Sequence, residues 1–162
     1  MRIKQSFGIL TLLVLLGAGC GGNLGSSGAT NSGGAVQPAG ASLDLSGRSL
    51  TSVPSDVFRQ TALEELNLSN NALTGALPSQ IQQLRNLRVL NASGNRMTGV
   101  PAEIGQLSNL QDLDLSENAL TGLPFELGNL QNLKRLDLRG NNVSKQDLDA
   151  IRAKLTRTEI LE

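Results

Sequence analysis

The chain of 162 residues balances 14 basic against 14 acidic side chains, and it contains no His, Trp or Tyr and a single Cys. Without His it has no side chain whose unperturbed pKa lies near neutrality, so it cannot build a Ser-His or Cys-His catalytic pair. The ligand sets of zinc and calcium sites and the basic patches of nucleic-acid binders are also missing, so we expect no metal, no cofactor and no nucleic-acid partner.

The first predicted element is an export signal over residues 1–19. Two basic residues, Arg2 and Lys4, precede an uncharged run from Phe7 to Leu16, which is followed by three small residues and then Cys20. This is the three-part layout of a secretory signal peptide. The uncharged run is roughly half of the ~20 residues that a membrane-spanning helix needs, so its length disfavours the alternative of a permanent transmembrane anchor.

The segment from Leu16 to Cys20, L-G-A-G-C, resembles the lipobox of bacterial lipoproteins. The resemblance implies cleavage before Cys20 and acylation of its thiol and new amino group, which would anchor an exported protein at the cell membrane or cell surface. One position departs from the pattern, since lipoboxes favour Leu three places before the cysteine and this chain has Gly17 there. Lipidation would explain why an exported protein keeps one unpaired Cys.

Residues 20–40 are predicted to form a flexible tether. From Gly21 to Gly40 the chain is almost entirely Gly, Ser, Ala, Asn and Thr, and such a segment cannot bury enough apolar area to fold. A flexible coil of this length spans about 25 Å, which would lift a folded domain clear of a membrane. The alternative is a disordered tail without an anchoring role, and the two interpretations differ only in whether Cys20 is lipidated.

An internal repeat fills the rest of the chain, residues 41–162. The segment Leu63–Leu73 recurs as Leu87–Met97, Leu110–Leu120 and Leu133–Val143, and a partial copy begins at Leu43. The shared pattern, L-x-x-L-x-L-x-x-N-x-L, resembles the leucine-rich-repeat family in its typical class, with one insertion near Gly75 that is similar to the plant-specific class. The resemblance implies an α/β right-handed solenoid, with a short parallel sheet on its concave face and loops or 3-10 turns on its convex face.

The physical basis of the repeat is the alternation of side chains along a strand. In each L-x-L the two leucines share one face, while the residue between them points to the other face. A single repeat buries too little apolar area to offset the entropy of ordering it, so neighbouring repeats must stack. A Pro begins each convex segment, and Gly105 and Gly128 weaken helix there, so we expect 3-10 turns or single helical turns.

Asparagines occupy the same place in four copies of the repeat. A side-chain amide at that place can satisfy both donors and acceptors of the backbone where the strand turns inward. We therefore interpret them as a structural ladder, and we expect the first copy, which has Arg48 there, to be looser. The ladder consists of Asn71, Asn95, Asn118 and Asn141.

Residues 144–162 depart from the repeat and are predicted to form a cap. Ser144, with Asp147 three residues later, resembles a capping box at the start of a helix. Leu148, Ile151 and Leu155 fall on one face of that helix, and residues 158–161 could add a final strand. A cap of this kind covers the exposed core at the end of a solenoid.

The side chains between the leucines are predicted to form a polar, mostly acidic binding face. It suits a polar or cationic partner, either a protein or a polysaccharide, although the aromatic residues that dominate many binding sites are missing. The alternative is a face that is merely soluble. The candidate contact residues are Asp44, Glu65, Asn67, Asn91, Asp112, Asp114, Arg135, Asp137 and Arg139.

The functional hypothesis is a monomeric, non-catalytic interaction module, lipid-anchored to the bacterial cell envelope. The alternative is a structural spacer of the envelope without a specific ligand. An acidic pair such as Asp112 and Asp114 could in principle do acid-base chemistry, but an open face without His disfavours an enzyme.

Overall fold

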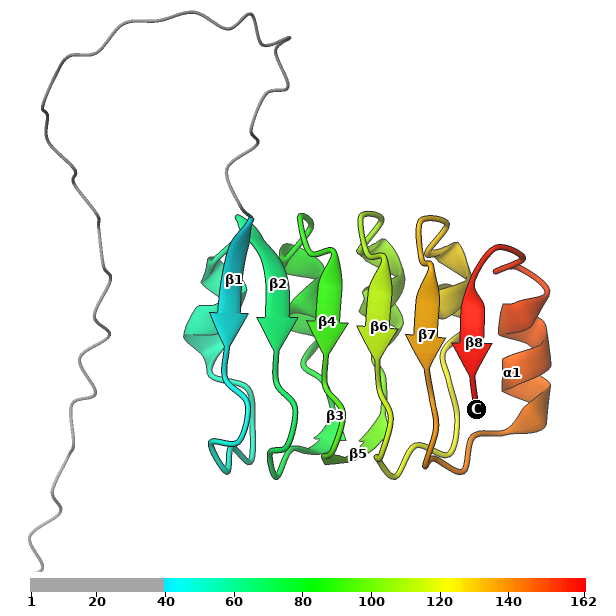
Figure 1. Cartoon of the computed structure of the whole chain (residues 1–162), viewed down its shortest axis with the longest axis horizontal. Helices are drawn as coiled ribbons and strands as arrows, with labels where there is room; N and C mark the ends of the chain where they lie inside the picture. The colour runs from blue at the N-terminus through cyan, green and yellow to red at the C-terminus, as the bar shows by residue number, and fades with distance from the viewer. Residues whose placement is uncertain (1–39) are drawn as a thin grey trace, which may run out of the picture. The chain divides into compact units, whose positions relative to one another are not determined.

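A computed structural model describes residues 40–162 of the chain. The predicted signal peptide over residues 1–19, Cys20 and the tether up to residue 39 lie outside this range. Strands and short helices alternate along the described part, so that successive coils stack side by side (Figure 1). None of the helices in residues 40–162 has the length and apolar character needed to cross a membrane.

Six short strands form one parallel sheet, and each coil contributes one of them. The leucine that lies between the two polar positions of each strand pairs with the same leucine of the next coil, so Leu66, Leu90, Leu113 and Leu136 form a row. This register confirms the parallel sheet predicted from the repeat. The strands, in sheet order, are β1 (Ala41–Asp44), β2 (Leu63–Asn67), β4 (Val89–Asn91), β6 (Asp112–Asp114), β7 (Arg135–Asp137) and β8 (Glu159–Leu161).

Four 3-10 helices cover the opposite side of the coils, as the sequence predicts. Each is preceded by a proline whose carbonyl oxygen accepts a hydrogen bond from the N–H three residues later. These prolines have extended backbone and occupy the N-cap position, one residue earlier than predicted. The helices are η1 (Ser55–Arg59), η2 (Ser79–Gln83), η3 (Ala102–Gln106) and η4 (Phe125–Asn129).

A second, two-stranded parallel sheet was not predicted from the sequence. It pairs β3 (Thr74–Ala76) with β5 (Arg96–Gly99) at the turns that follow the asparagine ladder. Gly75 adopts a left-handed backbone conformation with φ of 71°, which Gly tolerates without steric cost. Neither segment carries the L-x-L pattern that marks the strands of the six-stranded sheet, so the repeat did not predict them.

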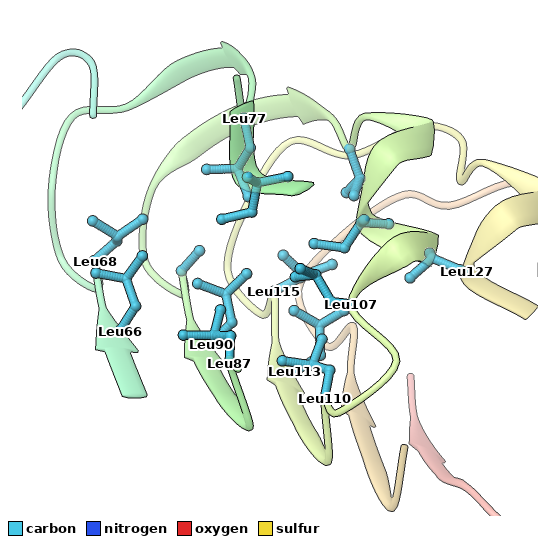
Figure 2. Close-up of a cluster of buried hydrophobic side chains, with 14 of the residues drawn as sticks. Leu66, Leu68, Leu77, Leu87, Leu90, Leu107, Leu110, Leu113, Leu115 and Leu127 are labelled. Atoms are coloured by element: carbon cyan, nitrogen blue, oxygen red, sulfur yellow. The ribbon is translucent and has the colours of Figure 1, made fainter. Parts of the chain in front are cut away.

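The leucines of all coils fill one continuous core behind the sheet (Figure 2). Leu90, Leu113 and Leu136 are fully buried, and so are the second leucines of the later strands, such as Leu115. The core extends from Leu45 in the first coil to Leu155 beyond the last repeat. No coil has a core of its own, which agrees with the expectation that a single repeat cannot fold.

The predicted cap is present at the C-terminal end. Helix α1 (Lys145–Arg152) buries Leu148 and Ile151 against the last coil, and β8 extends the sheet. The predicted capping box is wrong, because Ser144 occupies the N-cap position but its side chain makes no capping hydrogen bond. The Asp147 carboxylate instead accepts a hydrogen bond of 3.2 Å from the Leu123 N–H, in the preceding coil.

Two glycines allow close packing between neighbouring segments on the 3-10 helix side: Gly105 of η3 against η4, and Gly128 of η4 against the cap. A Cβ atom at Gly105 would collide with the carbonyl oxygen of Glu126 and lie 2.9 Å from its carbonyl carbon. For a Cβ atom at Gly128, the three nearest atoms all belong to the side chain of Lys154. From the sequence, these glycines were expected only to weaken helix formation. The structure shows that they also leave room for the neighbouring segment.

We expect Gly105→Ala to lower the free energy of unfolding by about 1–3 kcal/mol, because the added methyl group forces the backbone of the next coil to move. Gly128→Ala is the matched control and should lower the free energy of unfolding by less, because the Lys154 side chain can rotate away. Urea unfolding of the two full-length variants, followed by circular dichroism, measures both values. Equal losses would contradict the steric explanation.

Candidate binding surface

The side chains that lie between the leucines of the repeat line up across the sheet in columns, one residue from each strand. Glu65, Val89, Asp112 and Arg135 pair in register from β2 to β7. Asp44, Asn67, Asn91, Asp114 and Asp137 form the neighbouring column. We call the outward side of the six-stranded sheet, which carries these columns, the sheet face; it corresponds to the concave face of the prediction.

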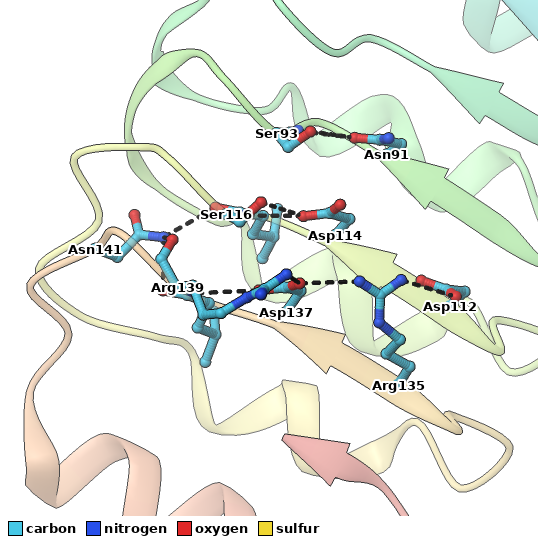
Figure 3. A network of polar contacts seen from close by, with 11 residues as sticks. Asn91, Ser93, Asp112, Asp114, Ser116, Arg135, Asp137, Arg139 and Asn141 are labelled. Carbon is cyan, nitrogen blue, oxygen red and sulfur yellow. Dashed lines mark hydrogen bonds and ion pairs between the residues drawn. The ribbon is translucent and has the colours of Figure 1, made fainter. Parts of the chain in front are cut away.

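The central column of the sheet face also terminates the strands. The side-chain oxygens of Asp44, Asn67, Asn91 and Asp114 each accept a hydrogen bond of 2.9–3.0 Å from the N–H of the serine two residues later. The hydroxyl groups of Ser93 and Ser116 donate to the same oxygens at 2.7 and 2.6 Å (Figure 3). These are Asx turns, in which a short polar side chain satisfies the backbone of the following turn. One oxygen of each residue is therefore committed to the fold.

Asp44 shows the electrostatic effect of this turn. The hydrogen bonds from the backbone and the side chain of Ser46 hold the pKa of the Asp44 carboxyl below its usual value. Hydrogen bonds to a carboxylate stabilise the charged form, so the group stays ionised to lower pH. Asp44 is exposed and presents its charge at the first strand of the sheet face.

Asp137 is covered by two arginines and is not an exposed contact residue, which corrects the prediction for this position. Its side chain is 0% exposed, and its Oδ2 atom lies 2.6 Å from Nη2 of Arg139 and 2.9 Å from Nη2 of Arg135 (Figure 3). The hydrogen bond from Arg139 is the largest of the effects that hold the pKa of Asp137 below its usual value. Side chains two residues apart on a strand share a face, so the sequence places Arg135 and Arg139 beside Asp137, but it does not show that both long side chains fold over the carboxylate.

The two halves of the sheet face therefore differ in how far their acidic side chains are paired. Arg135 also contacts Asp112, with 3.5 Å between Nη1 and Oδ2, so the acidic groups near β7 are largely neutralised. Among residues 40–162, Asp44, Glu65 and Asp114 form no ion pair. Acidic side chains occur along the whole sheet face, but Asp112 and Asp137 near β7 are paired with arginines, whereas those of the first strands are not.

A shallow hollow of about 290 Å³ lies over the first strands of the sheet face. Two exposed carboxylates and one partly exposed aliphatic side chain, Val89, contribute to its wall. This combination of charge and apolar area suits the side chain of a partner that is cationic at one end and aliphatic along its length. The lining residues are Ser42, Leu43, Asp44, Glu65, Leu66, Asn67, Val89 and Asn91.

The asparagines at the predicted ladder positions hydrogen-bond to the backbone of two adjacent coils. The Nδ2 atom of Asn95 donates to the carbonyl oxygens of Leu68 and Ala92, both at 3.0 Å, and its Oδ1 atom accepts from the N–H of Leu73 at 3.0 Å. Asn71, Asn118 and Asn141 make the equivalent bonds in their own coils and in the coil before. Every buried side-chain nitrogen and oxygen atom in residues 40–162 has a hydrogen-bond partner.

A second asparagine series, which the sequence analysis missed, lies at the edge where the strands begin. Asn86 donates to the Thr61 carbonyl oxygen, Asn109 to that of Arg85 and Asn132 to that of Ser108, at 2.8–2.9 Å. Each bond joins one coil to the coil before it. The signal was present in the sequence, because each of these asparagines directly precedes the first leucine of a repeat.

The groups on the sheet face are suited to recognising another molecule through hydrogen bonds and charges. In residues 40–162 no group of three or more His, Cys, Asp or Glu side chains is placed to hold a metal ion. The sheet face offers hydrogen-bond donors, acceptors and charges on a rigid, open surface, with its leucines turned to the opposite side.

The chain belongs to the leucine-rich repeat family, because the model of the leucine-rich repeat region matches residues 42–157. No curated protein matches the chain. The family and the fold together indicate a protein-interaction module.

Solved structures of the same fold come from bacteria and plants. A leucine-rich-repeat protein of Leptospira interrogans is 44% identical, with a TM-score of 0.65, over 68% of this chain and 28% of that protein. The ectodomain of the Arabidopsis thaliana receptor kinase SOBIR1 is 34% identical, with a TM-score of 0.60, over 74% of this chain and 67% of that one. This chain therefore spans much less than the full length of the bacterial relative.

A third structure was determined with a bound partner. The ectodomain of the Arabidopsis thaliana receptor kinase GASSHO1/SCHENGEN3, in complex with CASPARIAN STRIP INTEGRITY FACTOR 2, is 38% identical, with a TM-score of 0.63. The match covers 74% of this chain and 15% of that one. The solved relatives thus include extracellular domains that bind other molecules.

We expect Asn95→Ala to lower the free energy of unfolding by about 2–4 kcal/mol, because it removes several hydrogen bonds and leaves buried backbone groups unpaired. Asp114→Ala is the control, and its expected cost is about 1 kcal/mol, since its turn is partly exposed and water can replace the lost bonds. Urea unfolding midpoints of the two full-length variants measure the difference. Similar midpoints would refute a structural role for the asparagine ladder.

Proposed function

We propose that this protein is a non-catalytic interaction module that is exported, anchored to the bacterial cell envelope through an acylated Cys20, and binds a protein or another polar ligand through the sheet face. The observation that carries the proposal is the set of exposed polar side chains on a rigid sheet. These side chains are free of the core and, in the first strands, free of ion pairs among the described residues.

The charge of the sheet face suggests where a partner engages it. Asp44 and Glu65 are exposed and flank the hollow over the first strands. A partner with basic side chains would gain charge-assisted hydrogen bonds there. Near β7 the buried Asp137 is already neutralised, so the free donors of Arg135 and Arg139 suit acceptor groups of the same partner.

The relatives support binding as the general role. The receptor-kinase ectodomain crystallised with CASPARIAN STRIP INTEGRITY FACTOR 2 belongs to the same fold and is 38% identical to this chain where the two match. A stacked sheet suits this role because its outward side chains can change without disturbing the leucine core. A catalytic role has less support, since the chain has no His to act near neutral pH.

Export and anchoring rest on the sequence. The signal-like segment over residues 1–19 ends at the only Cys of the chain, and a segment rich in Gly and Ser follows it. Several acyl chains on Cys20 would give stable membrane attachment, where a single chain binds only marginally. The tether would leave the repeat domain free to meet its partner as a monomer.

The double variant Glu65→Arg, Val89→Arg tests the binding face. It reverses the charge of the hollow without touching the core, so we expect it to lose the partners that the unmodified full chain captures from envelope extracts. Its control is Ala102→Arg, Glu126→Arg, which makes the same change of charge on the 3-10 helix side and should keep those partners. Identical captured sets for the two variants would favour a structural spacer.

Cys20→Ser tests the anchor separately. In a bacterial host we expect the variant to lose labelling by radioactive palmitate and to leave the membrane fraction, because the thiol that would carry the lipid is gone. Fractionation and labelling of the unmodified chain in the same host provide the control. A variant that is processed and membrane-bound as before would refute lipidation at this residue.

A further inference from the structure

A polar pocket of about 350 Å³ lies at the C-terminal cap, away from the columns of the sheet face. Its lining residues come from the turn that precedes β7 and from the loop between α1 and β8. Both segments lie at the edge of the sheet where the strands begin (Figure 1). Its volume falls at the lower end of the range of about 300–1,000 Å³ typical of small-molecule sites. The lining residues are Gln131, Lys154, Leu155, Thr156, Arg157 and Thr158.

The loop that forms most of the pocket is fixed at both ends. The side chain of Leu155 is buried in the core, and the N–H groups of Lys154 and Leu155 both donate to the carbonyl oxygen of Ile151 at 3.0 Å. At the other end, the Thr158 hydroxyl donates to the Leu133 carbonyl oxygen at 2.7 Å. The intervening residues are therefore held in place before any ligand arrives, which reduces the entropic cost of binding.

The walls on either side of the loop are also positioned by neighbours. The aliphatic part of Lys154 lies directly over Gly128, where no side chain competes for the space. The amide of Gln131 donates to the Gly128 carbonyl oxygen at 2.9 Å, so this side chain is held against the same turn. Contacts within the cap and with the last coil of the solenoid therefore fix the walls of the pocket.

The charge of the pocket is uniformly positive. Lys154 and Arg157 are its only charged lining residues, and neither forms an ion pair within residues 40–162. By contrast, the nearby Arg152 is paired with both Asp149 and Glu162. The backbone N–H groups of Thr156 and Arg157 also donate to no backbone acceptor of the described part.

We propose that this pocket binds a phosphate group, either free or as the ester of a small organic molecule. A guanidinium and an ammonium group supply charge-assisted hydrogen bonds, and the Thr156 hydroxyl and the N–H groups of Thr156 and Arg157 add neutral donors around a tetrahedral oxyanion. The volume of the pocket is larger than a single phosphate group, which favours a phosphate ester over the free ion. The proposal does not depend on the sheet face binding a partner.

Two sources could present this chemistry, a dissolved phosphate ester and the head group of a phospholipid. The chain enters β1 at residue 40, and all six strands are parallel, so the pocket lies on the same edge of the solenoid as that entry point. The experiment has one arm for each source.

The first arm uses isothermal titration calorimetry of the full chain with glycerol 3-phosphate, and sodium chloride at matched ionic strength as the blank. We expect Lys154→Gln, Arg157→Gln to weaken binding by about tenfold or more, because it removes both charged donors. The control Arg96→Gln, Lys145→Gln removes the same two charges outside the pocket and should bind as the unmodified chain does. Absence of binding above the blank, or equal weakening in both variants, would overturn the proposal.

The second arm uses sedimentation with vesicles of phosphatidylglycerol, and vesicles of phosphatidylcholine for comparison. Residues 1–39 are common to all variants, so only the difference between the pocket variant and its control is informative. A weaker association of the pocket variant with phosphatidylglycerol identifies the lipid head group as the source. Equal association, together with loss of glycerol 3-phosphate binding in the first arm, identifies a dissolved ester.

Discussion

The structure depends on one constraint: no coil can satisfy all the backbone groups of its turn by itself. Where each strand bends inward, carbonyl and N–H groups are removed from water, and unpaired groups there would cost about 1–3 kcal/mol each. The ladder asparagine that meets this need acts on two coils at once. Asn95 bonds to Ala92 in its own coil and to Leu68 and Leu73 in the coil before. Stacking is therefore a condition for closing each coil, as well as for burying its leucines.

The same constraint shapes the binding surface. The sheet face presents a row of polar residues, but its central column ends the strands through Asx turns. Asp and Asn recur there because their short side chains reach the N–H two residues later, so their recurrence alone is no sign of a ligand. The side chains of the neighbouring column, from Glu65 to Arg135, form no Asx turns. Glu65, Val89, Asp112 and Arg135 vary in charge from coil to coil, and this variation gives the face its two unlike halves.

The sequence predicts those features that one repeat shares with the next. The period, the strands, the row of buried leucines and the 3-10 helices follow from residues that recur at fixed spacing, and the structure confirms them. The features it could not predict depend on contacts between unlike residues. Asp137 is covered because two arginines occur beside it in one coil only, and β3 pairs with β5 through backbone groups that leave no side-chain pattern. Asn86, Asn109 and Asn132 also recur at a fixed place in the repeat, so their bonds between coils could have been predicted from the sequence.

The failed capping box shows how the cap replaces a missing repeat. Asp147 does not close its own helix, because its carboxylate bonds to Leu123 in the coil before, much as a ladder asparagine serves its neighbour. Lys154 lies over Gly128, where the preceding coil has the backbone of Glu126 over Gly105. Thr158 donates to a carbonyl oxygen of the last repeat, as the edge asparagines do between repeats. The cap thus replaces a further repeat and covers the end of the core. Because Lys154 and the loop after it fill less space than a 3-10 helix would, the cationic pocket remains beside the cap.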